Sequence, residues 1–202
     1  MSEFVRVEVS NRSITQRKNK VHGVGTNDAW YMTKYSGIKC PYYVKWKSMI
    51  ERCYSEVGFL KDPTYVNCIV CDEWLLFSNF LAWMEQQDWV DKQLDKDIMV
   101  QGNKIYSPET CVFVNSDINL LLTDCRSSRG EYPLGVTFSK RDNKYIARIR
   151  LYSKSKILGS FKTSEEASAV YSKVKYYHIL EVAEQQSDHR VKLGLVRHAR
   201  AL

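Results

Sequence analysis

Lys144-Tyr-Ile-Ala-Arg-Ile-Arg150 alternates strictly between two kinds of side chain. Tyr145, Ala147 and Ile149 fall on one face, and a mainly cationic set falls on the other. A period of two residues predicts a β-strand with one buried face. The exposed face is therefore expected to carry positive charge. It consists of Lys144, Ile146, Arg148 and Arg150.

The sequence on either side of this strand predicts the rest of a small α+β domain. Gly135-Val-Thr-Phe-Ser139 precedes it, and residues 156–161 predict a further short strand. Thr163-Ser-Glu-Glu166 is a capping box, which opens a helix. One side of that helix can cover the sheet with Ala167, Val170, Tyr171 and Val174. We therefore predict a three-stranded antiparallel sheet packed on one helix over residues 134–183, with its basic face uncovered.

This segment resembles the DNA-binding domain of plant ethylene-response factors, which also occurs in phage and bacterial homing endonucleases. The matching residues are Gly135-Val136, 144–149, 158–161, 163–167 and Tyr171. The resemblance implies that the sheet enters the major groove of DNA, with Arg148 and Arg150 as base readers. It also implies a set of phosphate contacts, namely Lys140, Arg141, Lys144, Lys154 and Lys156. The alternative is a small α+β domain whose strand is merely solubilised by its charges.

Charge is distributed unevenly along the 202 residues. The net charge is +3 over residues 1–27, −4 over residues 28–128 and +8 over residues 129–202. A polyanion is therefore expected to meet the C-terminal third and the N-terminal arm. Backbone contacts are also expected on both sides of the reader domain. Their predicted residues are Arg12, Arg17, Lys18, Lys20, Arg126 and Arg129.

The middle block also carries a set of motifs. They are Trp46-Lys-Ser-Met-Ile-Glu-Arg-Cys-Tyr54, Cys71-Asp-Glu-Trp74, Phe77-Ser-Asn-Phe80, Trp83, Leu94-Asp-Lys-Asp97, Gly102-Asn103, Tyr106-Ser-Pro-Glu-Thr-Cys111 and Asn119. In this set the block resembles phage proteins related to HNH homing endonucleases. The resemblance implies a degenerate HNH-like domain of the ββα-metal type, with flanking helices, over residues 28–125.

An HNH site needs a histidine as general base, together with an Asp and a helical Asn or His that hold one divalent metal. By the resemblance, Asp95 takes the place of the metal-binding Asp, and Asn119 that of the helical ligand. Lys96 occupies the position of the general base, and Thr110 that of the residue that orients it. A lysine is protonated at neutral pH and cannot accept that proton. We therefore expect no catalysis, no metal and no cofactor.

An altered but active site is the alternative. It would use Asp95, Lys96 and Asn119 as catalytic residues, with Mg²⁺ on Asp95 and Asn119. Asp97 and Glu109 are the spare carboxylates that could shift roles. A zinc site at Cys68-Ile-Val-Cys71 is less favoured than buried thiols, because no second such pair accompanies it.

Composition and residue runs give the remaining expectations. The chain lacks a membrane-length apolar run and a signal peptide, so we expect a cytoplasmic protein in a bacterial host, encoded by a phage or mobile element. Residues 1–27 are predicted to be a basic arm, 126–133 a linker and 184–202 a basic tail. That tail could be a helix extension, a DNA contact or a disordered end. Helices are expected near residues 42–54, 74–87 and 117–123, and short strands near 94–97 and 111–114. The aromatic residues 30–46 favour a protein core over stacking on single-stranded bases.

These expectations converge on a sequence-specific double-stranded DNA-binding protein derived from a homing endonuclease. It is expected to be nuclease-inactive and repressor-like, with duplex DNA as its partner and neither a membrane nor a small-molecule substrate. A homodimer across a two-fold site would extend its footprint on DNA. Two alternatives are an active HNH nicking enzyme and an interaction protein whose basic surface meets something other than DNA.

Overall fold

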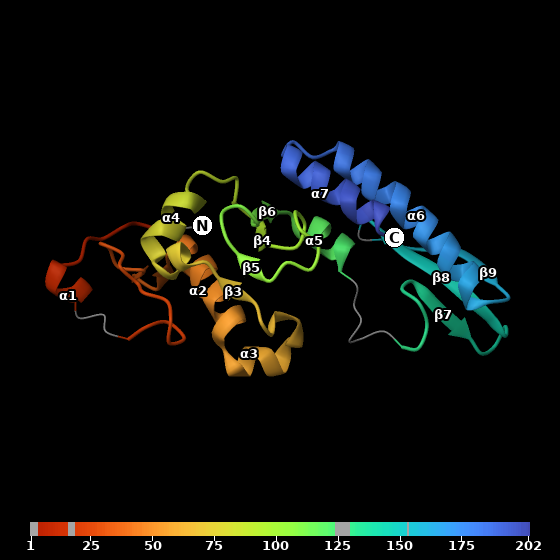
Figure 1. The fold of residues 1–202 in the computed structure, drawn as a ribbon, viewed down its shortest axis with the longest axis horizontal. Helices are drawn as coiled ribbons and strands as arrows, with labels where there is room; N and C mark the ends of the chain where they lie inside the picture. Colours follow the sequence, from red (N-terminus) through yellow and green to blue (C-terminus); the bar gives the residue numbers. More distant parts are fainter. Residues whose placement is uncertain (1–3, 16–18, 124–129, 153) are drawn as a thin grey trace. The chain divides into compact units, whose positions relative to one another are not determined.

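The computed structural model describes residues 4–15, 19–123, 130–152 and 154–202. It is a mixed α+β protein with several small sheets (Figure 1). The chain divides into two compact units, unit 1 (Met1–Phe113) and unit 2 (Val114–Leu202). Within the described residues, no helix combines the length and apolarity needed to cross a membrane.

The N-terminal residues of unit 1 pair with the segment that precedes its first long helix. The Val9 amide donates to the Trp30 carbonyl at 2.9 Å, and the Met32 amide donates to the Val7 carbonyl at 2.8 Å. Phe4 packs against the core. A short helix follows (α1, Asn11–Thr15), and later a two-stranded antiparallel ribbon (β1, Lys34–Tyr35; β2, Ile38–Lys39). Much of the described part of residues 1–27 is thus held against unit 1.

The predicted helix at residues 42–54 is confirmed as α2, Pro41–Tyr54. Pro41 stands at its first turn, where the missing N–H leaves no unmade bond. The apolar positions predicted for it lie in the core, as Trp46, Met49, Ile50 and Cys53 are buried. The Trp46 indole Nε1 donates to the Trp74 carbonyl at 2.7 Å, which fixes the ring deep in unit 1. For Tyr31 and Trp46, the core interpretation of the aromatic cluster is confirmed.

The prediction of one helix over residues 74–87 is wrong. A 3₁₀ helix (Asp72–Leu75) ends at Leu76, which is extended, and α4 then runs over Phe77–Met84. The Thr26 amide donates to the Leu75 carbonyl at 2.7 Å, and the Phe77 amide donates to the Thr26 carbonyl at 3.0 Å. These bridge contacts hold Leu76 in an extended conformation, which interrupts the helix.

The remaining elements of unit 1 are short. α3 (Glu56–Lys61) and a 3₁₀ helix (Pro63–Tyr65) follow α2. β3 (Ile69–Val70) pairs in parallel with β5 (Ile105–Tyr106), and β4 (Gln93–Asp95) pairs with β6 (Val112–Val114). The predicted strands near 94–97 and 111–114 are therefore present. The helix predicted near residues 117–123 is α5, Ser116–Leu122, in unit 2.

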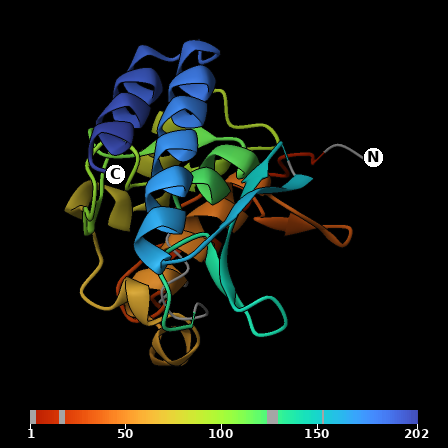
Figure 2. The ribbon, with the colours of Figure 1, turned by 90° about the vertical axis from the view of Figure 1, so that its right-hand side faces the viewer.

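Unit 2 contains the predicted three-stranded antiparallel sheet in the order β7-β8-β9. Its strands are β7 (Val136–Ser139), β8 (Lys144–Leu151) and β9 (Lys154–Phe161). The third strand begins at Lys154, two residues earlier than predicted, because Lys154 already pairs with Leu151. α6 (Ser164–Glu184) packs on the sheet with Ala167 and Tyr171 buried (Figure 2). The capping box at Thr163 and Glu166 is formed as predicted.

The C-terminal tail, for which three interpretations remained open, forms a helix, α7 (His189–Arg200). Asp188 caps its first turn by accepting the Arg190 amide at 2.8 Å. Val191, Leu195 and Ala199 recur every four residues and are buried, while α7 runs back alongside α6 in both views (Figures 1 and 2). The two helices form a hairpin that extends the core of unit 2.

Candidate nucleic-acid interface

The exposed face of β8 carries the predicted cations. Lys144, Arg148 and Arg150 are exposed, whereas Ala147 and Ile149 between them are buried. The alternation predicted from the sequence is therefore present in the strand. The apolar side is closed by α6, so the cations occupy the side that α6 leaves open.

Neighbouring strands add hydroxyl and apolar groups to the same face. Residues directly opposite one another in an antiparallel pair point to the same side of the sheet. Ile146 pairs with Thr137 on β7 and with Ser160 on β9, and Arg148 pairs with Ile157. Ile157 is 59% exposed, which is unusual for an isoleucine in a strand. The basic face, meaning Lys144, Ile146, Arg148 and Arg150 with these strand neighbours, thus combines charge with hydroxyl groups and exposed methyl groups.

A β-bulge in the β8–β9 pair divides the predicted cations between two sides. The register shifts between Ala147 and Arg148. Beyond that shift, Lys156 pairs with the buried Ile149, and Lys154 pairs with Leu151. Both lysines are exposed, but the register aligns them with the apolar side of β8. The structure therefore groups Arg148 with Arg150 and separates them from Lys154 and Lys156.

The turn between β7 and β8 presents two more predicted cations at one end of the sheet. Lys140 and Arg141 are exposed, and Arg141 forms an ion pair with Asp142, with Nε 3.1 Å from Oδ1. The Ser139 hydroxyl donates to Asp142 at 2.8 Å, and Asn143 takes a positive φ of 50°. These contacts stabilise the turn. They also bring Arg141 close to the Asp142 carboxylate, which weakens the attraction of Arg141 for an anionic ligand.

A hollow of about 730 Å³ lies over β7 and β8. Arg148, Arg150 and Thr137 line it together with Tyr132 from the preceding segment. Guanidinium groups form paired hydrogen bonds with phosphate oxygens and with the guanine edge, and methyl groups contact the thymine methyl. The hollow therefore contains groups suited to both parts of a nucleotide.

The position of the basic face depends on close packing beneath it. Gly135 adopts a φ of +77°, and its carbonyl oxygen accepts a hydrogen bond from the Arg148 amide at 2.8 Å. A Cβ at Gly135 would lie 2.1 Å from Cδ2 of Tyr171. The Tyr171 ring therefore sits directly against the backbone that carries β7. Substitutions at this contact should displace the sheet edge beside Arg148.

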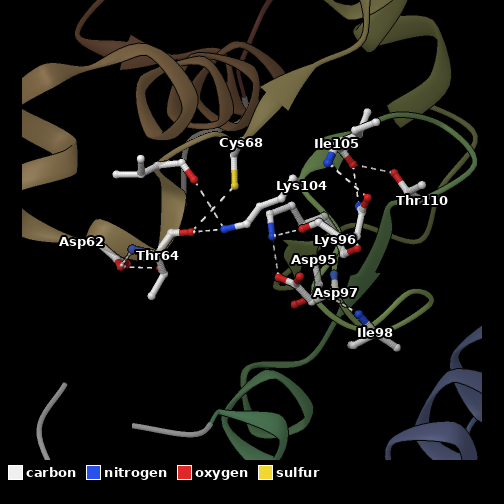
Figure 3. A network of polar contacts seen from close by, with 12 residues as sticks. Asp62, Thr64, Cys68, Asp95, Lys96, Asp97, Ile98, Lys104, Ile105 and Thr110 are labelled. Carbon is white, nitrogen blue, oxygen red and sulfur yellow. Dashed lines mark hydrogen bonds and ion pairs between the residues drawn. The ribbon is translucent and has the colours of Figure 1, made fainter. Parts of the chain in front are cut away.

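The residues predicted by resemblance to form an HNH site are arranged differently, and Asp95 and Lys96 belong to unit 1. Asp95 Oδ1 accepts the backbone amides of Asp97 at 2.7 Å and Ile98 at 2.8 Å, so this carboxylate caps a turn (Figure 3). Burial raises the pKa of Asp95 above its ordinary value. Lys96 is only 5% exposed, and its Nζ lies 2.7 Å from Asp97 Oδ2 and 2.7 Å from the Asn103 carbonyl oxygen. Lys96 is thus a buried ion-pair donor.

The other two predicted positions are Thr110, whose hydroxyl is hydrogen-bonded to the backbone, and Asn119, which belongs to another unit of the chain. The Thr110 hydroxyl donates to the Ile105 carbonyl at 2.7 Å, and it accepts the Ser107 amide at 3.2 Å. Asn119 belongs to α5 in unit 2. Among the described residues, no group of three or more His, Cys, Asp or Glu side chains could hold a metal ion. A capping carboxylate beside a buried ammonium group does not fit the Mg²⁺ ligand set of an HNH site.

The predicted arm and linker cations are only partly described by the structure. Arg12 and Lys20 are exposed in unit 1. Arg17, Lys18, Arg126 and Arg129 fall outside the residues that the structure describes. The thiols of Cys68 and Cys71 have pKa values raised mainly by burial, which favours structural cysteines over reactive ones.

Sequence reasoning overlooked some members of the basic face. Thr137, Ile157 and Ser160 join it through strand register, and Ser155 belongs with them because it pairs with Arg150. Because the bulge shifts the pairing of β9 with β8, residues 154–161 do not alternate regularly between the two faces of the sheet. Their sequence therefore does not indicate which face each residue lies on. For Thr137 a signal was present, because residues 136–139 already follow an alternating pattern.

The chain matches no protein-family model, no curated protein and no solved structure.

Proposed function

We propose that the protein binds double-stranded DNA in a sequence-specific manner through the basic face of the β7-β8-β9 sheet. One observation carries this proposal. Arg148 and Arg150 are both exposed on the same face of β8, and the other face of that strand is covered by α6. A two- or three-stranded sheet can enter the major groove, where arginine is the most common reader of guanine. The exposed Ile157 and the half-buried Ile146 supply apolar contacts of the kind that recognise thymine.

The proposal can be tested by selecting bound duplexes from a random library with the full chain. We expect one enriched motif, protection of that motif in footprinting, and an observed binding constant that falls steeply with salt. Lys144→Ala should weaken binding to all sequences similarly and reduce the salt slope by about one unit. Lys173→Ala on α6 is the matched control, since that exposed lysine lies on the helix rather than the sheet. Recovery of no motif, with salt-independent binding, would refute the proposal.

We further propose that residues 28–125 are related to HNH homing endonucleases and do not cut DNA. Along the chain, β4 and β6 are followed by α5 of unit 2, and this order agrees with a ββα arrangement. The residues at the positions of the metal ligand and the general base make structural contacts instead: Asp95 caps a turn, and Lys96 is paired with Asp97. The test is a nicking assay, in which the protein is incubated with Mg²⁺ or Mn²⁺ and a supercoiled plasmid that contains the selected motif. Metal-dependent nicking that disappears in Asp95→Ala would establish the enzyme instead.

A binder that does not cut would act by occupying its site, as a repressor does. This role places the protein in the cytoplasm of a bacterial host and agrees with the phage or mobile-element origin suggested by the sequence motifs. A homodimer would extend the short footprint of a single sheet. Sedimentation of the DNA complex tests this part: a dimer on a two-fold site is expected, and a monomer on an asymmetric site would contradict it.

A further inference from the structure

We propose that a pocket in unit 1 binds a phosphate group between the ammonium groups of Lys96 and Lys104. The pocket has a volume of about 180 Å³ and lies between residues 64–65 and residues 96–104. A cavity needs only about 10–15 Å³ to hold one water molecule, so this pocket has room for a larger group. This inference does not depend on DNA binding by the sheet.

Both lysines line the pocket. Lys104 comes from the segment before β5, and its Nζ donates to the Thr64 carbonyl at 2.8 Å. Lys96 follows β4, and its Nζ is held by Asp97 and the Asn103 carbonyl. Figure 3 shows the contacts of both ammonium groups: Lys104 bonds to the Thr64 carbonyl, and Lys96 bonds to Asp97. The carbonyl contacts fix each Nζ in place, so the site is preorganised.

The charges around the pocket favour an anion. Lys96 and Lys104 contribute two positive charges to the lining, and Asp97 contributes one negative charge. A metal cation would face two ammonium groups, and a neutral ligand would leave the excess charge in place. An anion would neutralise it.

Among anions, phosphate suits the donors that are present. Each ammonium group has three N–H donors, and the protein contacts of Lys96 at Nζ employ two of them. A tetrahedral oxyanion can accept from two separated ammonium groups through different oxygens, and such charge-assisted bonds are short and strong. The phosphate could belong to a nucleic-acid backbone or to free phosphate, since both present the same oxygens.

Inorganic phosphate is the probe for the test. The full chain is labelled with ¹⁵N-lysine and titrated with phosphate at constant ionic strength, while the side-chain amine signals are followed by NMR. We expect saturable shifts confined to Lys96 and Lys104. Lys104→Met should weaken phosphate binding about tenfold or more, as expected for loss of a charge-assisted hydrogen bond. Lys104→Arg should retain binding, and Lys34→Met, at an exposed position in β1, should leave it unchanged.

Lys104 is the position to vary because it is exposed, whereas replacement of the buried Lys96 perturbs the fold. Equal, non-saturating drifts of all lysine signals, or wild-type phosphate affinity in Lys104→Met, would overturn the proposal. Duplex DNA distinguishes the source of the phosphate. A backbone phosphate predicts that Lys104→Met lowers affinity for every duplex and reduces the salt slope by about one unit. Free phosphate predicts unchanged DNA affinity alongside the lost phosphate binding.

Discussion

Gly135→Ala should selectively destabilise unit 2, because two separate effects meet at this residue. Its φ of +77° lies in the left-handed region, which costs an L-residue about 1–2 kcal/mol. The added Cβ would also lie 2.1 Å from Cδ2 and 2.2 Å from Cε2 of Tyr171, far inside contact distance. Overpacking of this kind costs about 1–3 kcal/mol. Together the two effects amount to about 2–5 kcal/mol, a large part of the stability of a typical domain.

Gly37→Ala is the matched control for backbone strain. Gly37 has a similar φ of +81°, but an added Cβ there would meet nothing within 4 Å. We therefore expect a loss of only about 1–2 kcal/mol, and in unit 1 rather than unit 2.

The chain allows the two units to be followed separately in urea. All five tryptophans lie in unit 1, so tryptophan fluorescence reports on its unfolding. Hydrogen exchange of the β8 amides reports on unit 2. Gly135→Ala should accelerate exchange in β8 and leave the fluorescence transition near its wild-type midpoint. A loss no greater than that of Gly37→Ala would show that Tyr171 does not pack against Gly135.

Three further substitutions or conditions give distinct outcomes. Thr163→Ala removes the N-cap of α6 and should cost about 1 kcal/mol, seen as faster exchange in its first turn; unchanged exchange would contradict the capping box. Lys96→Met leaves the Asn103 carbonyl and Asp97 without their ammonium donor and should lower the unfolding free energy of unit 1 by about 1–3 kcal/mol; an unchanged urea midpoint would contradict it. Burial raises the pKa values of the Cys53 and Cys111 thiols from 9.0 to about 12. As the pH rises, these thiols therefore ionise in the unfolded chain before they ionise in the folded one. Their contribution to the stability of unit 1 should be fully present below pH 9 and should be lost as the pH rises towards 12. Cys111→Ala should make this loss of stability smaller.

Local patterns in the sequence predicted the sheet and its helix. The alternation around Ala147 and the capping box at Thr163 each depend on residues within one element, so both could be identified without a structure. The spacing of Val191, Leu195 and Ala199 also indicates a helix, but the surrounding cations obscured it.

Features set by distant contacts could not be predicted in this way. Leu76 is extended because Thr26, fifty positions earlier, bonds to its neighbours. The side of the sheet taken by Lys156 depends on the bulge opposite Arg148, which leaves no period in the sequence. The alternation of charges in Asp95-Lys-Asp97 indicates a local ion pair, and Lys96 does pair with Asp97, but its burial also depends on the Asn103 carbonyl seven residues away, which the local sequence does not reveal.

The most direct test of the central claim compares Arg148→Ala with Lys156→Ala in binding to the selected duplex. The two residues lie on adjacent strands within one register step of each other, but on opposite sides of the sheet. If the basic face binds DNA, Arg148→Ala should cost about 1–3 kcal/mol at the selected motif and relax the preference at one base pair. Lys156→Ala should leave both the affinity and the salt slope near their wild-type values. Equal losses in the two variants, or wild-type affinity in Arg148→Ala, would contradict the account.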